Sequence, residues 1–382
     1  MTDKGAAMRL LSRNATNALA AIHQLSGTPL TPAEKAAIRA ANQAKRDAKH
    51  AKQHGHGGYR VVPSALRVAP NATGSVSLID ASGIKYFINT NITFSTTSSA
   101  SAAMSEASYT HSVAASTLNG GTTMSTLNDA FDGYQTMCVS LTGATTNCAT
   151  GNANFTIYNK NGPATADGTC PGSRQYVFAA QAIGGLSVQR KVYVPSGDSF
   201  ARWLNIFTNT TGAPITFNMI VSNNLGSDSN TKVVSSSSGD NVATAADTWV
   251  SSFQNYSGTT SSDPREGHVF WGLGAQTPVS FINFVDGDDN PFWGYTITLA
   301  PGATKIIANF VTLQPSKAAA NTQAAALALY GPNQQQCMSG TELAQVVNFA
   351  PLGSLPTMSG WMLALLGMAL AGAATILLGR QS

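Results

Sequence analysis

Charged side chains are scarce in this chain of 382 residues. Asp, Glu, Lys and Arg make up 10% of it, whereas about 25% is usual in a soluble protein. Serine, threonine, asparagine and glycine take their place, which is typical of secreted and surface β-proteins. The sequence also lacks a Gly-x-Ser-x-Gly elbow, a His-Glu-x-x-His pair, a Walker loop and a dinucleotide-binding fingerprint. None of the enzyme classes that these motifs identify is therefore indicated.

Positive charge is concentrated at the N-terminus. Residues 1–67 hold eleven Lys and Arg against three carboxylates, and the rest of the chain holds eleven against fifteen. Thr31 and Glu34 predict a capped helix start, and the helix would run to about Gln53 without an apolar stripe. Residues 1–68 are therefore predicted to form a basic, partly helical or disordered arm.

This arm has neither the residue pattern of a nucleic-acid-binding segment nor that of a secretion signal. Aromatic residues are not interleaved with its basic ones, so nucleic acid is not an expected partner. It also lacks the apolar core of a secretion signal, which usually has 7–15 residues. An N-terminal signal is thus not evident, and either export is unusual or the start of the chain is wrong.

The four cysteines are Cys138, Cys148, Cys170 and Cys337. An even number in an exported protein indicates two disulfides, although four cysteines allow three pairings. Cys138 and Cys148 flank a turn-rich stretch and would close a short local loop. We favour that pair, which leaves Cys170 with Cys337; the alternative is four reduced, buried thiols. No Cys-x-x-Cys spacing supports a zinc site.

One long apolar run stands near the C-terminus. Residues 361–379 are nineteen residues without a charge, followed by Arg380. As a helix they would span ~30 Å, the thickness of a bilayer's hydrocarbon core. Trp361 suits the membrane interface, and Arg380 would remain on the cytoplasmic side. A transmembrane helix in contact with membrane lipid is therefore predicted, and its length and position argue against a helix buried in a soluble core.

A short block of residues frames this apolar run: Leu355, Pro356, Thr357, Ser359, Trp361 and Arg380. It resembles the IPTL-CTERM class of bacterial sorting signals, which have an Ile-Pro-Thr-Leu-Ser-x-Trp block, an apolar helix and a basic end. The chain departs from the class at Gly360, where an acidic residue is usual, and in ending with one Arg. The resemblance implies a bacterial protein sorted through residues 355–382, with a membrane-bound sorting or processing protease as partner. Whether the tail is cleaved stays open.

Residues 69–315 are rich in predicted strands. In the clearest run, Ile215, Phe217, Met219 and Val221 alternate with polar residues as in a half-buried strand, and only Ile220 breaks the pattern. Further β-rich segments are 185–194, 200–208, 279–285, 292–299 and 305–313. Such spacing indicates a mainly β fold, a large antiparallel β-sandwich. Within residues 316–354, the Ala-rich segment 317–330 and the segment 341–347 are predicted to be helices.

Segments 127–133, 190–195, 200–203 and 224–228 resemble a bacterial surface-protein module of the large β-sandwich kind. The resemblance implies a fold and no established activity. The related sandwich of sugar mutarotases is an analogy only, because a fold does not carry a function.

The densest acidic cluster contains Asp286, Asp288, Asp289 and Asn290. These side chains offer the hard oxygen ligands that calcium prefers, although the spacing is not that of an EF-hand. The alternative is a polar hairpin turn between segments 279–285 and 292–299, for which Asp-Gly and Asn-Pro are suitable. We favour the turn, and apart from calcium no cofactor is indicated.

Two groups of residues could carry carbohydrate chemistry. Glu266 and His268 would share one face of a strand, where His268 could act as a general base. Arg202 with Trp203, and Trp271 with Trp293, could line a sugar-stacking surface if exposed; aromatic residues in a sandwich are more often core. A structural role is favoured for both groups.

These observations lead to a non-enzymatic bacterial cell-surface or exported protein with a structural or adhesive β-sandwich. Its body would lie on the periplasmic or extracellular side, held by the C-terminal helix. The alternative is a carbohydrate-binding or carbohydrate-active, mutarotase-like sandwich with surface glycans as partners. A third hypothesis, a tail-anchored protein facing the cytoplasm, would explain the missing secretion signal.

Overall fold

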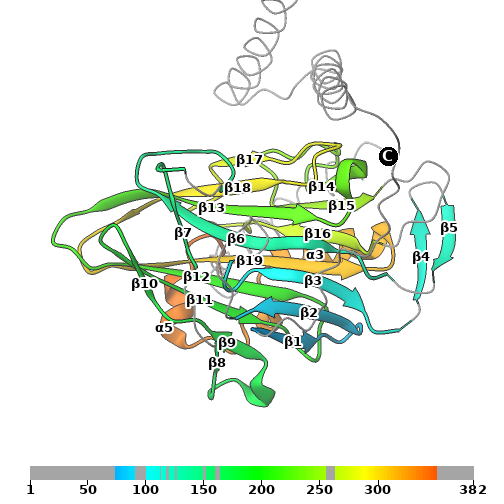
Figure 1. Cartoon of the computed structure of the whole chain (residues 1–382), viewed down its shortest axis with the longest axis horizontal. Helices are drawn as coiled ribbons and strands as arrows, with labels where there is room; N and C mark the ends of the chain where they lie inside the picture. The colour runs from blue at the N-terminus through cyan, green and yellow to red at the C-terminus, as the bar shows by residue number, and fades with distance from the viewer. Residues whose placement is uncertain are drawn as a thin grey trace, which may run out of the picture. The chain divides into compact units, whose positions relative to one another are not determined.

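In the computed structural model, two antiparallel β-sheets form the body of the part of the chain that the structure describes (Figure 1). The structure describes residues 74–90, 100–111, 113–117, 120–124, 127–148, 152–159, 164–254 and 263–350. The predicted arm, residues 1–68, and the predicted sorting signal, residues 355–382, lie outside them. Within the described residues, the prediction of a mainly β, sandwich-like fold is confirmed.

Sheet 1 has eight strands in the described part of the chain, and Figure 1 shows its main path running from β1 to β17. In spatial order the strands are β1 (Ser75–Ile79), β2 (Ile84–Asn89), β3 (Met104–Tyr109), β6 (Phe131–Ser140), β13 (Ile215–Leu225), β18 (Phe292–Leu299) and β17 (Phe281–Asn283), with β7 (Thr156–Ile157) paired to β6. Every pairing is antiparallel.

Sheet 2 has nine strands among the described residues. In spatial order they are β14 (Thr231–Ser236), β15 (Trp249–Gln254), β16 (Arg265–Val269), β19 (Thr304–Gln314), β12 (Ala201–Asn209), β11 (Leu186–Tyr193), β9 (Gln175–Val177) and β8 (Thr165–Ala166), with β10 (Gln181–Ile183) paired to β11. A separate hairpin joins β4 (Val113–Thr117) and β5 (Gly120–Met124). The strands predicted from the sequence at 185–194, 200–208, 292–299 and 305–313 are confirmed as β11, β12, β18 and β19.

The main core lies between the two sheets and is built by the period-two pattern of the strands. On β18, Trp293, Tyr295 and Ile297 face inward and are buried. They meet residues of sheet 2 such as Trp203 and Val311. Burial of such aromatic and aliphatic surface at about 25 cal/mol per Å² is the dominant favourable contribution to folding.

Strand β13 differs from its prediction in one respect. A half-buried strand was expected, but residues 217–223 are buried on both faces. The residue that broke the alternation, Ile220, explains this, because it packs on the outer face against the disulfide of Cys138 and Cys148. The loop that this disulfide closes therefore covers the middle of sheet 1 from outside.

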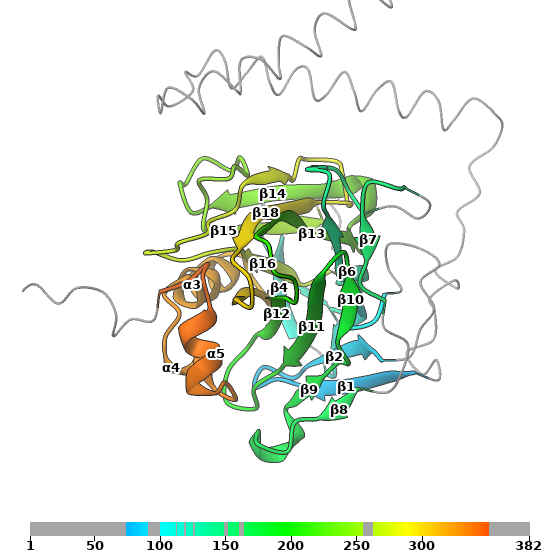
Figure 2. The ribbon, with the colours of Figure 1, turned by 90° about the vertical axis from the view of Figure 1, so that its left-hand side faces the viewer.

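In the described residues three helices follow β19, and Figure 2 shows them together on one side of the sheets. They are α3 (Lys317–Ala328), α4 (Pro332–Gln335) and α5 (Gly340–Gln345); α3 and α5 confirm the predicted helices 317–330 and 341–347. Ser316 caps α3, which packs on β15, β16 and β19. Gly267 of β16 makes this approach possible, because a Cβ there would meet Ala324 and the backbone of Ala320. No helix in the described residues is both long and apolar enough to cross a membrane.

Both predicted disulfides are present. Cys138 is bonded to Cys148, ten residues away, and Cys170 is bonded to Cys337, 167 residues away. The first closes a local loop on sheet 1. The second joins the segment between β8 and β9 to the segment between α4 and α5, so it attaches the helices to sheet 2.

The two disulfides should differ in their contribution to stability. Replacing Cys170 and Cys337 by Ser should lower the free energy of unfolding by about 5 kcal/mol, and replacing Cys138 and Cys148 by about 3 kcal/mol, because a longer closed loop restricts the unfolded chain more. Denaturant unfolding of the two double variants without reductant measures both losses. Equal losses, or a larger loss from the short loop, would contradict the expectation.

Candidate functional site

Glu266 and His268 lie two residues apart on β16 and point to the same side of it, as predicted. The hydroxyl of Ser252 on β15 donates to Glu266 Oε2 at 2.9 Å and lies 2.8 Å from His268 Nε2. The other ring nitrogen, Nδ1, lies 2.6 Å from the hydroxyl of Tyr134 on β6. A neutral imidazole satisfies all these contacts when Tyr134 donates to Nδ1 and Nε2–H donates to Ser252.

This chain of four residues is enclosed by the core. His268 is fully buried and Glu266 is 4% exposed, and the rings of Phe284 and Trp293 lie beside the imidazole. Burial lowers the pKa of His268 to about 3 and raises the pKa of Glu266 well above its usual value. A general base must reach the proton that it removes. Both side chains point between the sheets, where they are enclosed by the core.

The proposed sugar-stacking surface is not formed. Trp203 and Trp293 are fully buried, and Arg202 is buried as well. Trp203 points into the core, where its Nε1 donates to the carbonyl of Ala102 at 2.7 Å. Of these four residues, Trp271 alone is partly exposed. The sandwich explains this outcome, because inward-facing aromatic residues of both sheets fill the space between them.

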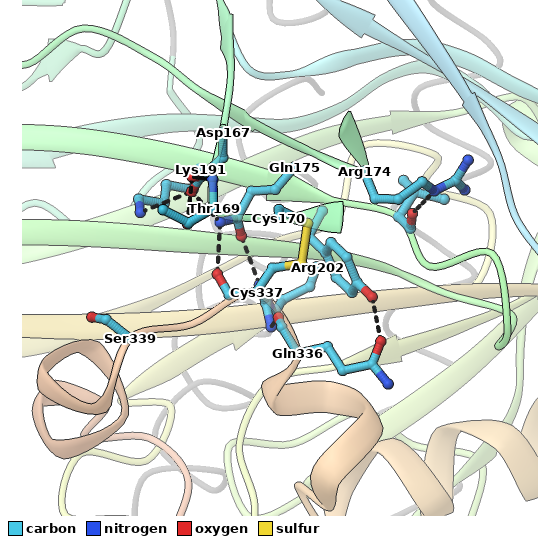
Figure 3. Close-up of a disulfide and its surroundings, with 12 residues drawn as sticks. Asp167, Thr169, Cys170, Arg174, Gln175, Lys191, Arg202, Gln336, Cys337 and Ser339 are labelled. Atoms are coloured by element: carbon cyan, nitrogen blue, oxygen red, sulfur yellow. Dashed lines mark hydrogen bonds and ion pairs between the residues drawn. A yellow bond between two sulfur atoms is a disulfide. The ribbon is translucent and has the colours of Figure 1, made fainter. Parts of the chain in front are cut away.

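Arg202 instead holds the C-terminal helices on sheet 2, beside the disulfide of Cys170 and Cys337 (Figure 3). Its Nη1 donates to the carbonyl oxygens of Gln334 and Gln336 at 2.6 and 2.8 Å. Its Nη2 donates to Gln175 Oε1 at 2.7 Å. Burial lowers the pKa of Arg202 to about 10, so it stays charged at neutral pH.

Lys191 makes a second connection to the same helices. Its Nζ lies 2.8 Å from Glu342 Oε1 on α5 and 3.4 Å from Asp167 Oδ2. Hydrogen bonds from Thr169 lower the pKa of Asp167 well below its usual value. The disulfide, Arg202 and Lys191 thus attach α4 and α5 to sheet 2 by three different kinds of bond. The sequence offered no signal for this arrangement beyond the cysteine pairing.

The acidic residues at 286–290 lie in the connection between β17 and β18, as the turn hypothesis expected. The carboxylate of Asp286 accepts from the backbone N–H of Val233 at 2.9 Å and from Lys232 Nζ at 3.1 Å. Asp288 and Asp289 accept hydrogen bonds from Asn290. In the described residues no group of three or more His, Cys, Asp or Glu side chains is placed to hold a metal. The calcium hypothesis therefore gains no ligand set from the structure.

The outer face of sheet 1 carries residues that the sequence analysis did not single out. Thr216 of β13 and Thr296 and Thr298 of β18 are exposed, and the rings of Phe281 and Phe292 are partly exposed beside them. The alternation of β18 could have indicated Thr296 and Thr298. The position of Phe281 could not be predicted, because it depends on the pairing of β17 with β18.

No known protein family and no curated protein matches the chain. Among solved structures, a galactose mutarotase-like protein from Lactobacillus casei is 10% identical, with a TM-score of 0.37 over 63% of this chain and all of that one. A polysaccharide lyase is 10% identical, with a TM-score of 0.32, and the match covers 68% of this chain and 35% of the lyase. A heparan sulfate lyase from Pedobacter heparinus is 11% identical with a TM-score of 0.32, over 80% of this chain and 42% of that one. Values this low support no conclusion about activity or ligand.

The buried carboxyl of Glu266 predicts a distinctive pH dependence. Since burial raises its pKa, the stability that Glu266 contributes is present below about pH 4.5 and is lost as the pH rises through the raised value. Glu266→Gln keeps an acceptor for Ser252 but cannot ionise. The variant should therefore gain melting temperature relative to the parent protein between about pH 4 and pH 8.

A matched control is Glu342→Gln. The pKa of Glu342 is lowered by its hydrogen bonds to Lys191 and Ser339, against the effect of burial, so this variant should lose melting temperature as the pH rises. Thermal melts of both variants across the range give the answer. A pH-independent difference for Glu266→Gln would show that Glu266 ionises as an ordinary carboxyl.

The buried guanidinium of Arg202 predicts a local effect. Arg202→Met keeps the aliphatic part of the side chain but leaves the carbonyls of Gln334 and Gln336 without their donor. It should cost about 3 kcal/mol, with amide exchange accelerated first at residues 332–345. Lys191→Met, which removes less buried ion pairs, should cost about 1 kcal/mol or less. Equal effects of the two substitutions in hydrogen exchange would refute this ranking.

Proposed function

We propose that the chain works outside the reducing cytoplasm as a disulfide-linked β-sandwich module of the bacterial envelope. The observation that carries this proposal is the pair of disulfides, Cys138–Cys148 and Cys170–Cys337. Disulfides form and persist in oxidising compartments and are rare in the cytosol. The scarcity of charge and the abundance of small polar residues agree with such a location.

A non-enzymatic role is supported by the placement of the titratable groups. The two residues with the best sequence claim to catalysis, Glu266 and His268, face the closed interior. A structural or adhesive module needs a stable body and an attachment. The two disulfides, and the helices held on sheet 2 by Arg202 and Lys191, support a stable body.

The attachment is proposed from the sequence. The nineteen uncharged residues 361–379 and Arg380 would tether the module to membrane lipid, and the block from Leu355 to Trp361 would be read by a membrane-bound sorting or processing protease. The body would then lie on the periplasmic or extracellular side.

A carbohydrate-binding role is the second candidate. The observation that favours it is the outer face of sheet 1, where exposed threonines lie beside partly exposed aromatic rings. This candidate is compatible with the first, because a module of the envelope can also bind glycans.

Export is tested on the full chain in intact bacterial cells. Free thiols are blocked before lysis, the protein is then reduced, and the newly released thiols are labelled. Mass spectrometry of the protein counts the labels. The expected result is four thiols that are labelled only after reduction, in protein found in the membrane fraction. Protease added to cells with a permeabilised outer envelope and an intact inner membrane should also digest the body of the protein. A protein dissolved in the cytosol with four thiols blocked from the start would refute the proposal.

A further inference from the structure

The outer face of β18 presents a row of alternating residues to the outside of sheet 1. Trp293, Tyr295 and Ile297 point into the core, so Phe292, Gly294, Thr296 and Thr298 occupy the other side. Consecutive members of this row are about 7 Å apart. Thr296 and Thr298 are exposed, and Phe292 is partly exposed.

A glycine within the row makes room for an aromatic ring. Phe281 of β17 is paired directly with Gly294. A Cβ at Gly294 would collide with the ring of Phe281 and would lie 2.6 Å from the carbonyl oxygen of Met219. The ring of Phe281 therefore takes the position that a side chain at 294 would fill, next to Thr296. It packs, together with Phe292, on the disulfide of Cys138 and Cys148.

The polar groups of this face are held in fixed orientations. Thr216 and Thr298 share a hydrogen bond of 2.9 Å between their hydroxyls. The hydroxyl of Thr296 donates to Asn218 Oδ1 at 2.8 Å, and Asn218 Nδ2 donates to the carbonyl of Ala144 at 3.0 Å. Each hydroxyl oxygen retains acceptor capacity for a ligand. The face thus combines oriented hydroxyls with partly exposed aromatic rings.

The strands of this face carry almost no charge, and the carboxylates of Asp286, Asp288 and Asp289 lie beyond its Phe292 end, in the connection between β17 and β18. In β6, β13, β17 and β18, Asp132 is the one charged residue. It lies near the Leu225 end of β13, opposite the end that carries Thr216, since Leu225 pairs with Phe131 and Asn218 with Ser140. Nucleic acids and acidic polymers need clustered Lys and Arg for binding. Charge complementarity therefore selects an uncharged partner for this surface.

We propose that the outer face of sheet 1, formed by Thr216, Phe281, Phe292, Thr296 and Thr298, binds a neutral polysaccharide. The rings of Phe281 and Phe292 contact the apolar C–H face of sugar rings, because an aromatic face buries apolar surface with specific geometry. The threonine hydroxyls hydrogen-bond the sugar hydroxyls, as a few convergent polar groups do in ligand sites generally. This inference rests on the carbohydrate-binding candidate and does not require export.

The test uses the full chain and a panel of neutral glycans: cellulose and chitin as solids, and β-glucan, mannan, xylan and dextran in solution. Depletion assays and titration calorimetry measure the affinity. At least one glycan should bind, with an affinity that is insensitive to salt, because no charges are involved. Phe281→Ala should weaken that binding at least tenfold, and Thr296→Val, which keeps the side-chain shape but removes the hydroxyl, three- to tenfold.

Leu273→Ala is the matched control, because Leu273 is 65% exposed and is not part of the face; it should bind within twofold of the parent protein. Thr296→Val guards against the case in which Phe281→Ala does not fold. Absence of binding to the whole panel, or equal binding by the parent protein and its folded variants, would overturn the proposal. So would a dimer that Phe281→Ala converts to monomer, since a second copy would then be the occupant. Glycan binding is read out on purified protein, so its failure is distinguishable from a failure of export.

Discussion

The packing of two sheets face to face is the constraint on which the rest of the structure depends. A side chain that points between the sheets must be apolar or must have its polar atoms paired, because an unpaired buried polar group costs about 1–3 kcal/mol. Besides the group around His268, a second polar layer pairs most of its polar atoms, although Arg190 Nη2 is buried without a hydrogen-bond partner. Arg190 Nε donates to Asn205 Oδ1 at 2.8 Å, Asn205 Nδ2 to Asn309 Oδ1 at 3.3 Å, and Asn309 Nδ2 to the hydroxyl of Tyr295 at 2.7 Å. This layer joins three strands of sheet 2 to β18 of sheet 1.

The layer shows how charge is accommodated inside the sandwich. Arg190 is fully buried, and its Nη1 donates to the carbonyl oxygen of Gln135 on β6 at 2.8 Å. Burial lowers its pKa to about 9. Arg202 likewise uses carbonyl and amide oxygens as acceptors. Because removing one partner of a buried charge is costly, these bonds fix the register of the strands and the position of α4. The charged groups inside the sandwich therefore connect strands and helices to one another.

Much of this architecture could be predicted from the sequence, because it depends on local patterns. The period-two pattern of residues 292–299 predicted the strand that the structure shows as β18. The turn-rich stretch between Cys138 and Cys148 indicated the local disulfide. The common face of Glu266 and His268 followed from their spacing. The sequence could not show what that face packs against, because β16 is buried on both sides. Helix α3 lies against Gly267 on one side, and Tyr134 lies against His268 on the other. Contacts between residues 134 positions apart have no local signal.

The same reasoning explains what the sequence left open. Trp203 and Trp293 could have lined a surface or a core, and the pairing of the strands decides which. Ile220 broke the alternation of β13 because a disulfide loop covers it from outside. The position of Phe281 on the outer face of sheet 1 could not be predicted either, because it depends on the pairing of β17 with β18 and on a glycine opposite the ring. Residues that lie next to each other only after folding cannot be grouped from spacing.

The closed interior is tested most directly by nuclear magnetic resonance of the His268 ring while the pH is lowered from about 8 to about 4. A buried imidazole with a pKa lowered to about 3 keeps its chemical shift over this range. A titration midpoint near the ordinary histidine value of 6.5 would contradict a closed core and would restore His268 as a candidate general base.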